Sequence, residues 1–272
     1  MLTVNSLRRY LHRYKIADMK KVLLFLLVPL ILFSCVTQER VEHRALIAHA
    51  GGEIDSCIYT NSREALEQAV VRGYSFIEFD FQFTSDSVLV AAHSWSDFNK
   101  MTGFAHKGDS APSLNEFKSR RIYERYTPLT ASEINRFFEQ RSDIYLVTDK
   151  VSQPEILARY FPGLKSRMVV EAFSYPHYTQ LKKEGYFRVL YSCMADDLSA
   201  TMVKHLLFHG LFRGERVEWV ALHISGFDNP MFRFINKFRL FNVALFTVDN
   251  IDDIPPEYAG RAKMIYTNFL QP

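Results

Sequence analysis

The stretch Phe76-Ile77-Glu78-Phe79-Asp80-Phe81-Gln82-Phe83, followed by Thr84-Ser85-Asp86-Ser87 and Val88-Leu89-Val90-Ala91-Ala92-His93, decides the fold. Residues 76–83 and 88–93 both have the aromatic and β-branched composition of strands. The four residues between them are too few for the crossover of about a dozen residues that joins parallel strands. Residues 84–87 are therefore predicted to form a hairpin turn, which places 88–93 antiparallel beside 76–83.

Outside this hairpin, strand-like and helix-like segments alternate along the chain. This alternation is typical of a parallel sheet with crossover helices. Nine segments are strand-like, and eight parallel strands remain once the hairpin strand is set aside. We therefore predict a (β/α)8 TIM barrel in a single domain, residues 45–272 of the 272-residue chain. The strand-like segments are 45–49, 76–83, 88–93, 145–149, 168–172, 187–191, 219–223, 242–247 and 264–267, and the helix-like ones are 62–72, 131–139, 154–160, 176–184, 199–208 and 230–238.

Residues 94–128 interrupt the alternation. They have no clean period, are rich in charged and aromatic side chains, and directly follow His93. Long irregular loops in compact domains are usually functional or disordered. We expect a loop insertion at about 94–128 that acts as a lid or faces the substrate.

The first 35 residues resemble an export signal. Met19-Lys20-Lys21 is a basic start, residues 22–33 are apolar apart from Pro29, and Leu32-Phe33-Ser34-Cys35 resembles a bacterial lipobox. The apolar run is shorter than the roughly 20 residues of a membrane span. We predict a signal peptide and lipobox in residues 1–35, a linker in 36–44, and acylation at Cys35. The protein would then be lipid-anchored at the bacterial cell envelope, periplasmic or on the outer surface; an uncleaved signal anchor is the alternative.

The charge distribution argues against a nucleic-acid partner. Six of the 33 Lys and Arg and one of the 30 Asp and Glu lie in residues 1–34, so the remainder has a net charge of −2. A small anionic substrate would therefore have to be bound by a local site. Besides Cys35, only Cys57 and Cys193 remain; their spacing does not suit zinc, and they could pair in an oxidising compartment.

Polar residues stand where strands of the barrel are predicted to end. His49 and His93 end the first strand and the hairpin strand, Glu78 and Asp80 face one side because they are two positions apart, and Asp149 ends the next parallel strand. Three clustered carboxylates repel one another, and hard oxygen ligands favour Mg²⁺ or Ca²⁺. Two imidazoles suit a general base and a general acid.

Structural roles are the alternative for each of these residues. A single strand-end histidine is more often part of a hydrogen-bonded framework than a catalyst. Glu78 and Asp80 could form an ordinary polar stripe, but acids facing into an apolar barrel are costly unless they are paired or bind a metal. For Glu171 and His223, at later strand ends, structural roles are favoured over lining the pocket.

An ordered set of motifs resembles the glycerophosphodiester phosphodiesterase family. The family pattern is His-Arg-Gly, Asn-Thr, Glu-x-Asp and His-Asp, in that order. The resemblance covers roughly residues 45–272 and is strong to residue 93. Its motifs here are Ile47-Ala48-His49-Ala50-Gly51-Gly52, Thr60-Asn61-Ser62-Arg63-Glu64-Ala65, Ile77-Glu78-Phe79-Asp80 and Val90-Ala91-Ala92-His93, with Phe246-Thr247-Val248-Asp249-Asn250 and Ile265-Tyr266-Thr267-Asn268 for the final two strands.

The resemblance implies metal-dependent hydrolysis of a glycerophosphodiester or a related phospholipid head-group phosphodiester. His49 and His93 would be the acid–base pair, and a neighbouring hydroxyl of the substrate alcohol would be the nucleophile. Glu78 and Asp80 would bind the cation, Ca²⁺ or Mg²⁺, with Asp149 in the place of the family's third ligand, usually Glu. Lys150 and Asn61 would bind substrate; Asn61 alternatively caps the next helix or braces the first loop.

Three positions depart from the family pattern. Ala50 stands where the family has Arg, so Lys150 or a residue such as Arg63 must supply the positive charge for phosphate, or substrate binding differs. Thr148-Asp149-Lys150 replaces Glu-x-Lys, which leaves open whether Asp149 or a residue one position away is the third ligand. Ser94 replaces the Asp after the second histidine. These changes resemble a divergent branch, between glycerophosphodiesterases and phosphatidylinositol-specific phospholipases C.

Two other functions remain open at this point. The loss of Arg at Ala50 is compatible with a non-catalytic envelope binding protein on a degenerate barrel, although such a protein has little reason to keep two histidines and three acids. A metal-independent phospholipase C-like lyase would use Arg or Lys in place of the metal. The full set of Glu78, Asp80 and Asp149 argues against it.

Overall fold

The computed structural model describes residues 44–193, 199, 202–207 and 216–272. His43–Pro272 form one compact unit. The predicted signal peptide with Cys35, nearly all of the linker and part of the predicted helix 199–208 lie outside the described residues. Among the helices that are described, none is both long and apolar enough to cross a membrane.

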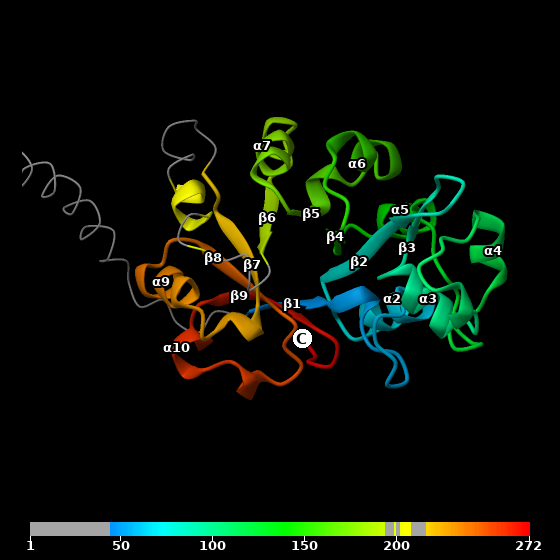
Figure 1. Ribbon diagram of the computed structural model, residues 1–272, viewed down its shortest axis with the longest axis horizontal. Coiled ribbons are helices and arrows are strands. Elements are labelled where there is room, and N and C mark those ends of the chain that lie inside the picture. Colours follow the sequence, from blue (N-terminus) through cyan, green and yellow to red (C-terminus); the bar gives the residue numbers. More distant parts are fainter. Residues whose placement is uncertain (1–43, 194–198, 200–201, 208–215) are drawn as a thin grey trace, which may run out of the picture. The chain divides into compact units, whose positions relative to one another are not determined.

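Eight parallel strands close into a barrel, which confirms the predicted (β/α)8 fold. Around the ring the order is β1-β9-β8-β7-β6-β5-β4-β2, and pairing of β1 with β2 closes it. The strands, labelled in Figure 1, are β1 (Ala45–Ala48), β2 (Phe76–Phe83), β4 (Tyr145–Asp149), β5 (Met168–Ala172), β6 (Arg188–Cys193), β7 (Trp219–His223), β8 (Asn242–Phe246) and β9 (Ala262–Thr267).

The ninth strand, β3 (Leu89–Ala91), pairs antiparallel with the end of β2, as the four-residue turn predicts. The backbone N–H of Thr84 donates to the Val88 carbonyl at 2.9 Å, which closes the turn. Ser87 adopts the left-handed conformation (φ 63°) that tight hairpin turns require. The hairpin therefore extends β2 beyond the barrel and leads the chain to His93.

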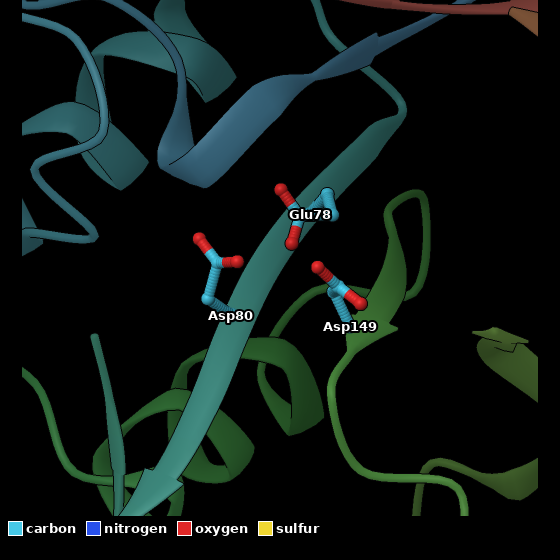
Figure 2. Close-up of side chains that lie close together, drawn as sticks. All are labelled: Glu78, Asp80 and Asp149. Carbon is cyan, nitrogen blue, oxygen red and sulfur yellow. The ribbon is translucent and has the colours of Figure 1, made fainter. Parts of the chain in front are cut away.

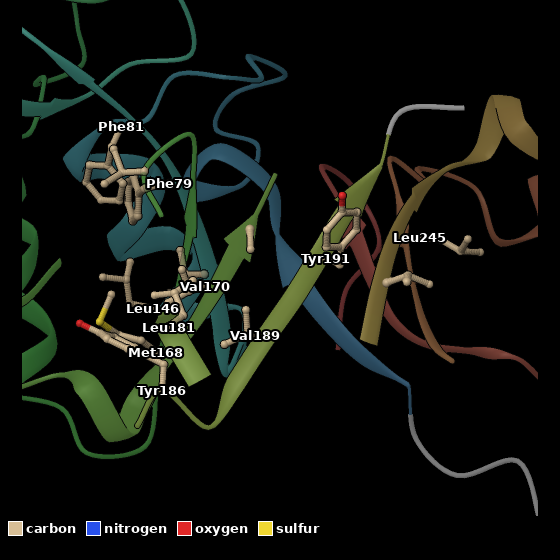
Figure 3. Close-up of a cluster of buried hydrophobic side chains, with 14 of the residues drawn as sticks. Phe79, Phe81, Leu146, Met168, Val170, Leu181, Tyr186, Val189, Tyr191 and Leu245 are labelled. Atoms are coloured by element: carbon tan, nitrogen blue, oxygen red, sulfur yellow. The ribbon is translucent and has the colours of Figure 1, made fainter. Parts of the chain in front are cut away.

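The crossover helices cover the outer surface of the strands. Side-chain caps begin several of them: the hydroxyl of Ser62 caps α2 and that of Thr130 caps α5. Strand residues such as Phe79 and Val170 pack against helix residues such as Leu181 in the main core between the two layers (Figure 3), called here the barrel core. The helices are α2 (Arg63–Val71), α5 (Ala131–Glu139), α6 (Pro154–Tyr160), α7 (Tyr175–Lys183), α9 (Pro230–Phe238) and α10 (Pro256–Ala259), with short 3₁₀ turns η1 (His49–Gly51), η2 (Ala105–Lys107), η3 (Lys165–Arg167), η5 (Ile224–Gly226) and η6 (Ile251–Asp253).

A second set of apolar residues fills the barrel interior, and it determines which polar residues face inward. Ile47, Val147 and Val169 belong to this interior cluster. Side chains alternate along a strand, so the residues two positions further on point the same way. Asp149 and Glu171 therefore follow Val147 and Val169 toward the C-terminal mouth of the barrel.

The insertion contains two helices and has its own apolar core, so the expectation of a loop without regular structure is wrong. The helices are α3 (Trp95–Met101) and α4 (Leu114–Ser119). The rings of Phe98 and Phe117 stack with centroids 4.7 Å apart. The insertion core consists of Ile54, Ala65, Val90, Ala92, Trp95, Phe98, Phe117, Ile122 and Tyr126. A lid role for the insertion stays a prediction.

Candidate active site

Three carboxylates meet at the mouth of the barrel. Figure 2 shows Glu78 and Asp80 extending from β2 toward Asp149 at the end of β4. One oxygen from each residue lies within 4.8 Å of those of the other two. Asp80 and Asp149 are register partners in the parallel pair β2–β4, which explains how residues 69 positions apart come together. Glu78 and Asp80 are each 1% exposed.

The Glu78 carboxylate has one satisfied and one unsatisfied oxygen. Its Oε2 accepts a 2.7 Å hydrogen bond from the backbone N–H of Ala50, which lies in the η1 turn directly after β1. Its Oε1 is buried without a partner. Burial raises the pKa of Glu78 well above its usual value, and the negative charges of Asp80 and Asp149 raise it further. A cation at this point would relieve both the burial and the repulsion.

The Asp80 carboxylate is held by two neighbours. Its Oδ2 accepts from the Asn61 side-chain amide at 3.0 Å, and its Oδ1 lies 3.1 Å from the Lys150 ammonium. Burial alone would raise the pKa of Asp80, but Lys150, His93 and the hydrogen bond from Asn61 outweigh it, so the net shift is downward. Asp80 is therefore the carboxylate of the three that stays ionised most readily.

Asp149, and not its neighbour Thr148, joins the carboxylate cluster. Thr148 is fully buried and outside that cluster, whereas Asp149 faces the mouth and accepts a 2.6 Å hydrogen bond from the backbone N–H of Lys150. Burial, followed by the charges of Glu171 and Asp80, raises the pKa of Asp149 well above its usual value. The concern that this position lies one residue away from the cluster is therefore removed.

His49 lies at the same mouth, at the end of β1. Its Nδ1 is 3.2 Å from the Thr247 hydroxyl, contributed by the residue after β8. Burial lowers the pKa of His49 to about 4; Asp80 and Asp249 act in the opposite direction, and His93 and Lys150 add to the lowering. His49 is therefore a neutral imidazole at pH 7, able to take up a proton at one nitrogen.

His93 has a carboxylate partner that the sequence analysis missed. Its Nδ1 lies 2.7 Å from Oδ2 of Asp97, which is in the first turn of α3. Ser94 caps α3 and its hydroxyl donates to the same carboxylate at 2.5 Å. A carboxylate oxygen at this distance accepts the ring N–H and so fixes the tautomer and the orientation of the imidazole. The pattern Ser94-x-x-Asp97 was the available signal, because it is a helix-capping pattern that begins next to His93.

The residues predicted to bind substrate differ in what they contact. Lys150 lies beside Asp80, and its ammonium also donates to the backbone carbonyl of His93. Arg63, the other candidate cation, forms an ion pair with Glu133 of α5 at 3.6 Å. Asn61 is fully buried and both polar atoms of its amide bond to Asp80; Ser62, not Asn61, caps α2. Direct substrate contacts by Lys150 and Asn61 stay predictions.

Two later strand-end residues have partners of their own. Glu171 is buried inside the barrel and accepts a 2.5 Å hydrogen bond from the Tyr266 hydroxyl; burial raises the pKa of Glu171 to about 7. His223 bonds through Nδ1 to Ser225, which organises the η5 turn. Cys57 carries a free thiol, so the structure contains no Cys57–Cys193 disulfide.

The donor set at the mouth fits a hard divalent cation. It offers three carboxylates and a buried oxygen without a hydrogen-bond donor, and oxygen ligands of this kind are those that Ca²⁺ and Mg²⁺ prefer. Among the described residues this is the one group with such ligand spacing. Two imidazoles lie at the same mouth, so the arrangement can bind an anion, polarise it and transfer protons to and from it.

Known proteins share this sequence pattern and this fold. Residues 43–173 match the sequence model of the glycerophosphoryl diester phosphodiesterase family. A glycerophosphodiester phosphodiesterase from Thermotoga maritima is similar in structure (TM-score 0.60, 14% identity, covering 84% of this chain and 96% of that one). So is one from Parabacteroides distasonis (TM-score 0.58, 16% identity, 82% and 92%). An Oleispira antarctica phosphodiesterase, solved with the product sn-glycerol-3-phosphate, has a TM-score of 0.61 at 17% identity (82% and 92%). No curated protein sequence matches the chain.

Proposed function

We propose that this chain, whose residues 43–173 match the sequence model of the glycerophosphoryl diester phosphodiesterase family, hydrolyses a glycerophosphodiester, or a related phospholipid head-group phosphodiester, with a divalent cation and two histidines. The observation that carries the proposal is the convergence of Glu78, Asp80 and Asp149 within 4.8 Å. A phosphodiester is an anion, so a mouth lined by acids can bind it only if a cation intervenes.

The cation is Ca²⁺ or Mg²⁺, held by Glu78, Asp80 and Asp149. When bound, it supplies a positive charge that offsets the charge developing on the phosphate oxygens. Hydrogen bonds orient two of the ligands before the cation binds: the Ala50 N–H donates to Glu78, and the Asn61 amide donates to Asp80. The Lys150 ammonium lies 3.1 Å from Asp80. It would supply the positively charged side chain for the phosphate, which the family pattern provides with Arg at the position of Ala50.

His49 and His93 divide the proton transfers. His49, neutral because burial lowers its pKa to about 4, takes the proton from a neighbouring hydroxyl of the substrate as that oxygen attacks phosphorus. His93, backed by Asp97, gives a proton to the leaving alcohol oxygen as its bond to phosphorus breaks. Water then opens the cyclic phosphodiester with the two roles exchanged, which restores both histidines.

The Lys150–Asp80 contact also favours a second candidate, a metal-independent phospholipase C-like lyase. There Lys150 would provide the positive charge, and the cyclic phosphodiester would be released as product. Burial of Glu78 Oε1 without a donor speaks for the cation instead, because the lysine does not reach that oxygen. The two candidates differ in whether removal of metal stops turnover.

The test is turnover of a panel of glycerophosphodiesters with Ca²⁺, with Mg²⁺ and with EDTA. Product analysis by phosphorus NMR separates the hydrolysed monoester from a cyclic phosphodiester. We expect loss of turnover in EDTA, recovery with one of the two cations, and no turnover by His49→Ala in any condition. Unchanged turnover in EDTA with a cyclic product would establish the lyase, and absence of turnover on the whole panel would leave a binding protein.

We also propose that acylation at Cys35 anchors the protein to the cell envelope. The support is the basic start, short apolar run and lipobox-like Leu32-Phe33-Ser34-Cys35. An anchored enzyme would meet head-group phosphodiesters where phospholipids are turned over. Two acyl chains or more are needed for stable anchoring, which bacterial lipid modification at a terminal cysteine would provide.

A further inference from the structure

Tyr59 is placed between the two histidines. The centroid of its ring lies 4.7 Å from that of His49, at an interplanar angle of 72°, and 4.9 Å from that of His93, at 56°. Both are edge-to-face or tilted contacts at the short end of the range for aromatic pairs. One side chain from the loop before α2 therefore contacts both imidazoles, which come from β1 and from the end of the hairpin.

The Tyr59 hydroxyl is connected to His49 by a second route. The side chain of Thr247 hydrogen-bonds to Tyr59, and its hydroxyl lies 3.2 Å from His49 Nδ1. Burial raises the pKa of Tyr59, followed in the same direction by Asp80 and Glu78, so the phenol keeps its proton at neutral pH. Ring contact and shared partner together fix the plane of the His49 imidazole.

The backbone around Tyr59 is held in an unfavourable conformation. Tyr59 has φ 58°, and Asp55, Ser56 and Asn61 also have positive φ. Non-glycine residues adopt this left-handed conformation rarely, and such residues persist where the surrounding structure over-determines them. Contacts that hold the loop include the paired backbone hydrogen bonds between Ile54 and Cys57 (2.9 and 2.8 Å), the Arg72–Glu53 ion pair (2.7 Å) and the Tyr126–Asp55 hydrogen bond (2.9 Å).

We propose that Tyr59 is a positioning residue of the phosphodiesterase reaction, whose ring sets the spacing and orientation of the His49 and His93 imidazoles. The inference rests on the proposed function, because it concerns the two histidines of that reaction. Proton transfer at two oxygens of one phosphodiester needs both imidazoles aligned at once, and a ring in contact with both couples their positions. A displacement of about 1 Å at such a site lowers rates on the order of 100-fold.

Two substitutions in the full-length chain separate the ring from its hydroxyl. Tyr59→Phe keeps the ring and removes the bond to Thr247. Tyr59→Gly removes the ring and suits the left-handed backbone, so it relieves backbone strain instead of adding it. Tyr145→Ala is the control: Tyr145 begins β4, at the opposite end of the barrel, and stacks on Phe76 with centroids 4.9 Å apart.

The measurements are kcat and KM against pH, and the titration of each histidine ring by NMR. For Tyr59→Gly we expect kcat to fall on the order of 10- to 100-fold at nearly constant KM. The pKa of His49 should rise from about 4 toward 6.5, because the imidazole becomes exposed when the Tyr59 ring is removed. The charged and titratable groups that act on His49 stay in place: Asp80, Asp249, His93 and Lys150. Tyr59→Phe should keep kcat within about fivefold, and Tyr145→Ala should leave both titrations in place.

The outcomes distinguish this inference from the proposed function. If Tyr59→Gly keeps kcat within twofold of the wild type and leaves the pKa of His49 unchanged, Tyr59 is a packing residue and the inference is wrong. If the wild type turns over no phosphodiester while Tyr59→Gly still raises the pKa of His49, the ring does hold the His49 imidazole, and the phosphodiesterase reaction is what fails.

Discussion

Oδ2 of Asp97 lies 2.7 Å from Nδ1 of His93, although no carboxylate directly follows that histidine in the sequence. The contact comes from the first turn of α3, which Ser94 caps with its hydroxyl. The helix therefore brings a carboxylate to the imidazole from four residues away.

Replacing this carboxylate should impair proton transfer while the fold is kept. An amide at position 97 no longer stabilises a protonated His93, so Asp97→Asn should lower kcat by about 10²–10⁴-fold with a smaller change in KM. The control is Asp86→Asn, which alters another exposed carboxylate with a capping contact, to the Leu114 N–H. Equal kcat in both variants and the wild type would exclude Asp97 from the reaction.

Removing metal should make stability depend on pH in a defined direction. The pKa values of Glu78 and Asp149 are raised in the folded chain, so metal-free folded protein holds protons that the unfolded chain releases above about pH 4. The stability that these protons confer is full below the unfolded pKa values and is lost as pH rises through the folded ones. In EDTA, the Tm should therefore fall as pH rises through these raised pKa values, as scanning calorimetry would record.

Adding Ca²⁺ should reverse that loss. A ligand at 100 times its Kd stabilises by about 2.7 kcal/mol, which for a chain of this size raises the Tm by roughly 5–10 °C. The gain should be larger at pH 8 than at pH 5, because protons compete with the cation. Glu78→Gln should flatten the pH dependence and remove most of the gain; an equal gain in this variant would place the cation elsewhere.

Asn61 should affect the affinity for the metal ion without being one of its ligands. Asn61→Gly keeps the left-handed backbone permitted but removes both side-chain bonds to Asp80. Loss of a residue that orients a ligand costs about 10–100-fold in metal affinity. Calorimetric titration with Ca²⁺ would measure it, with Asn236→Ala on α9, whose amide bonds to the Glu257 carbonyl, as control. An unchanged affinity for Ca²⁺ would mean that the hydrogen bonds from Asn61 are not needed to orient Asp80.

Lipid anchoring can be tested on the cysteines. Cys35→Ala should abolish incorporation of labelled palmitate in a bacterial host and move the protein from the detergent phase to the aqueous phase. Cys57→Ala, which changes a free thiol in the loop before α2, should do neither. Palmitate labelling that survives the change at Cys35 would disprove acylation there.

Much of the barrel could be predicted from sequence because its strands are apolar runs with sharp ends. The bounds of β2, β4, β5 and β7, and of α5, α6 and α9, agree to the residue with the predicted segments. Helices α3 and α4, with seven and six residues, were missed because they lie in a segment whose charged and aromatic side chains follow no clean period.

The carboxylate cluster could also be anticipated, since inward-facing positions follow from strand alternation. The roles of Asp97 and Tyr59 could not. Asp97 reaches His93 only because α3 starts where it does, and Tyr59 reaches both histidines only through a left-handed backbone that no sequence pattern indicates for tyrosine. Lys150 was expected to meet the substrate; that it lies on Asp80 depends on its own positive φ.

The hairpin strand joins the two apolar cores of the molecule. Leu89 and Ala91 belong to the barrel core, and Val90 and Ala92 to the insertion core. A chimera that exchanged only residues 94–128 with those of a relative would leave Val90 and Ala92 packed against side chains of the other protein. Ala92 directly precedes His93, so a change in this packing would reach that histidine. The transferable module in this protein therefore begins at the turn near Thr84, and a change to the insertion also changes the residues that lead to His93.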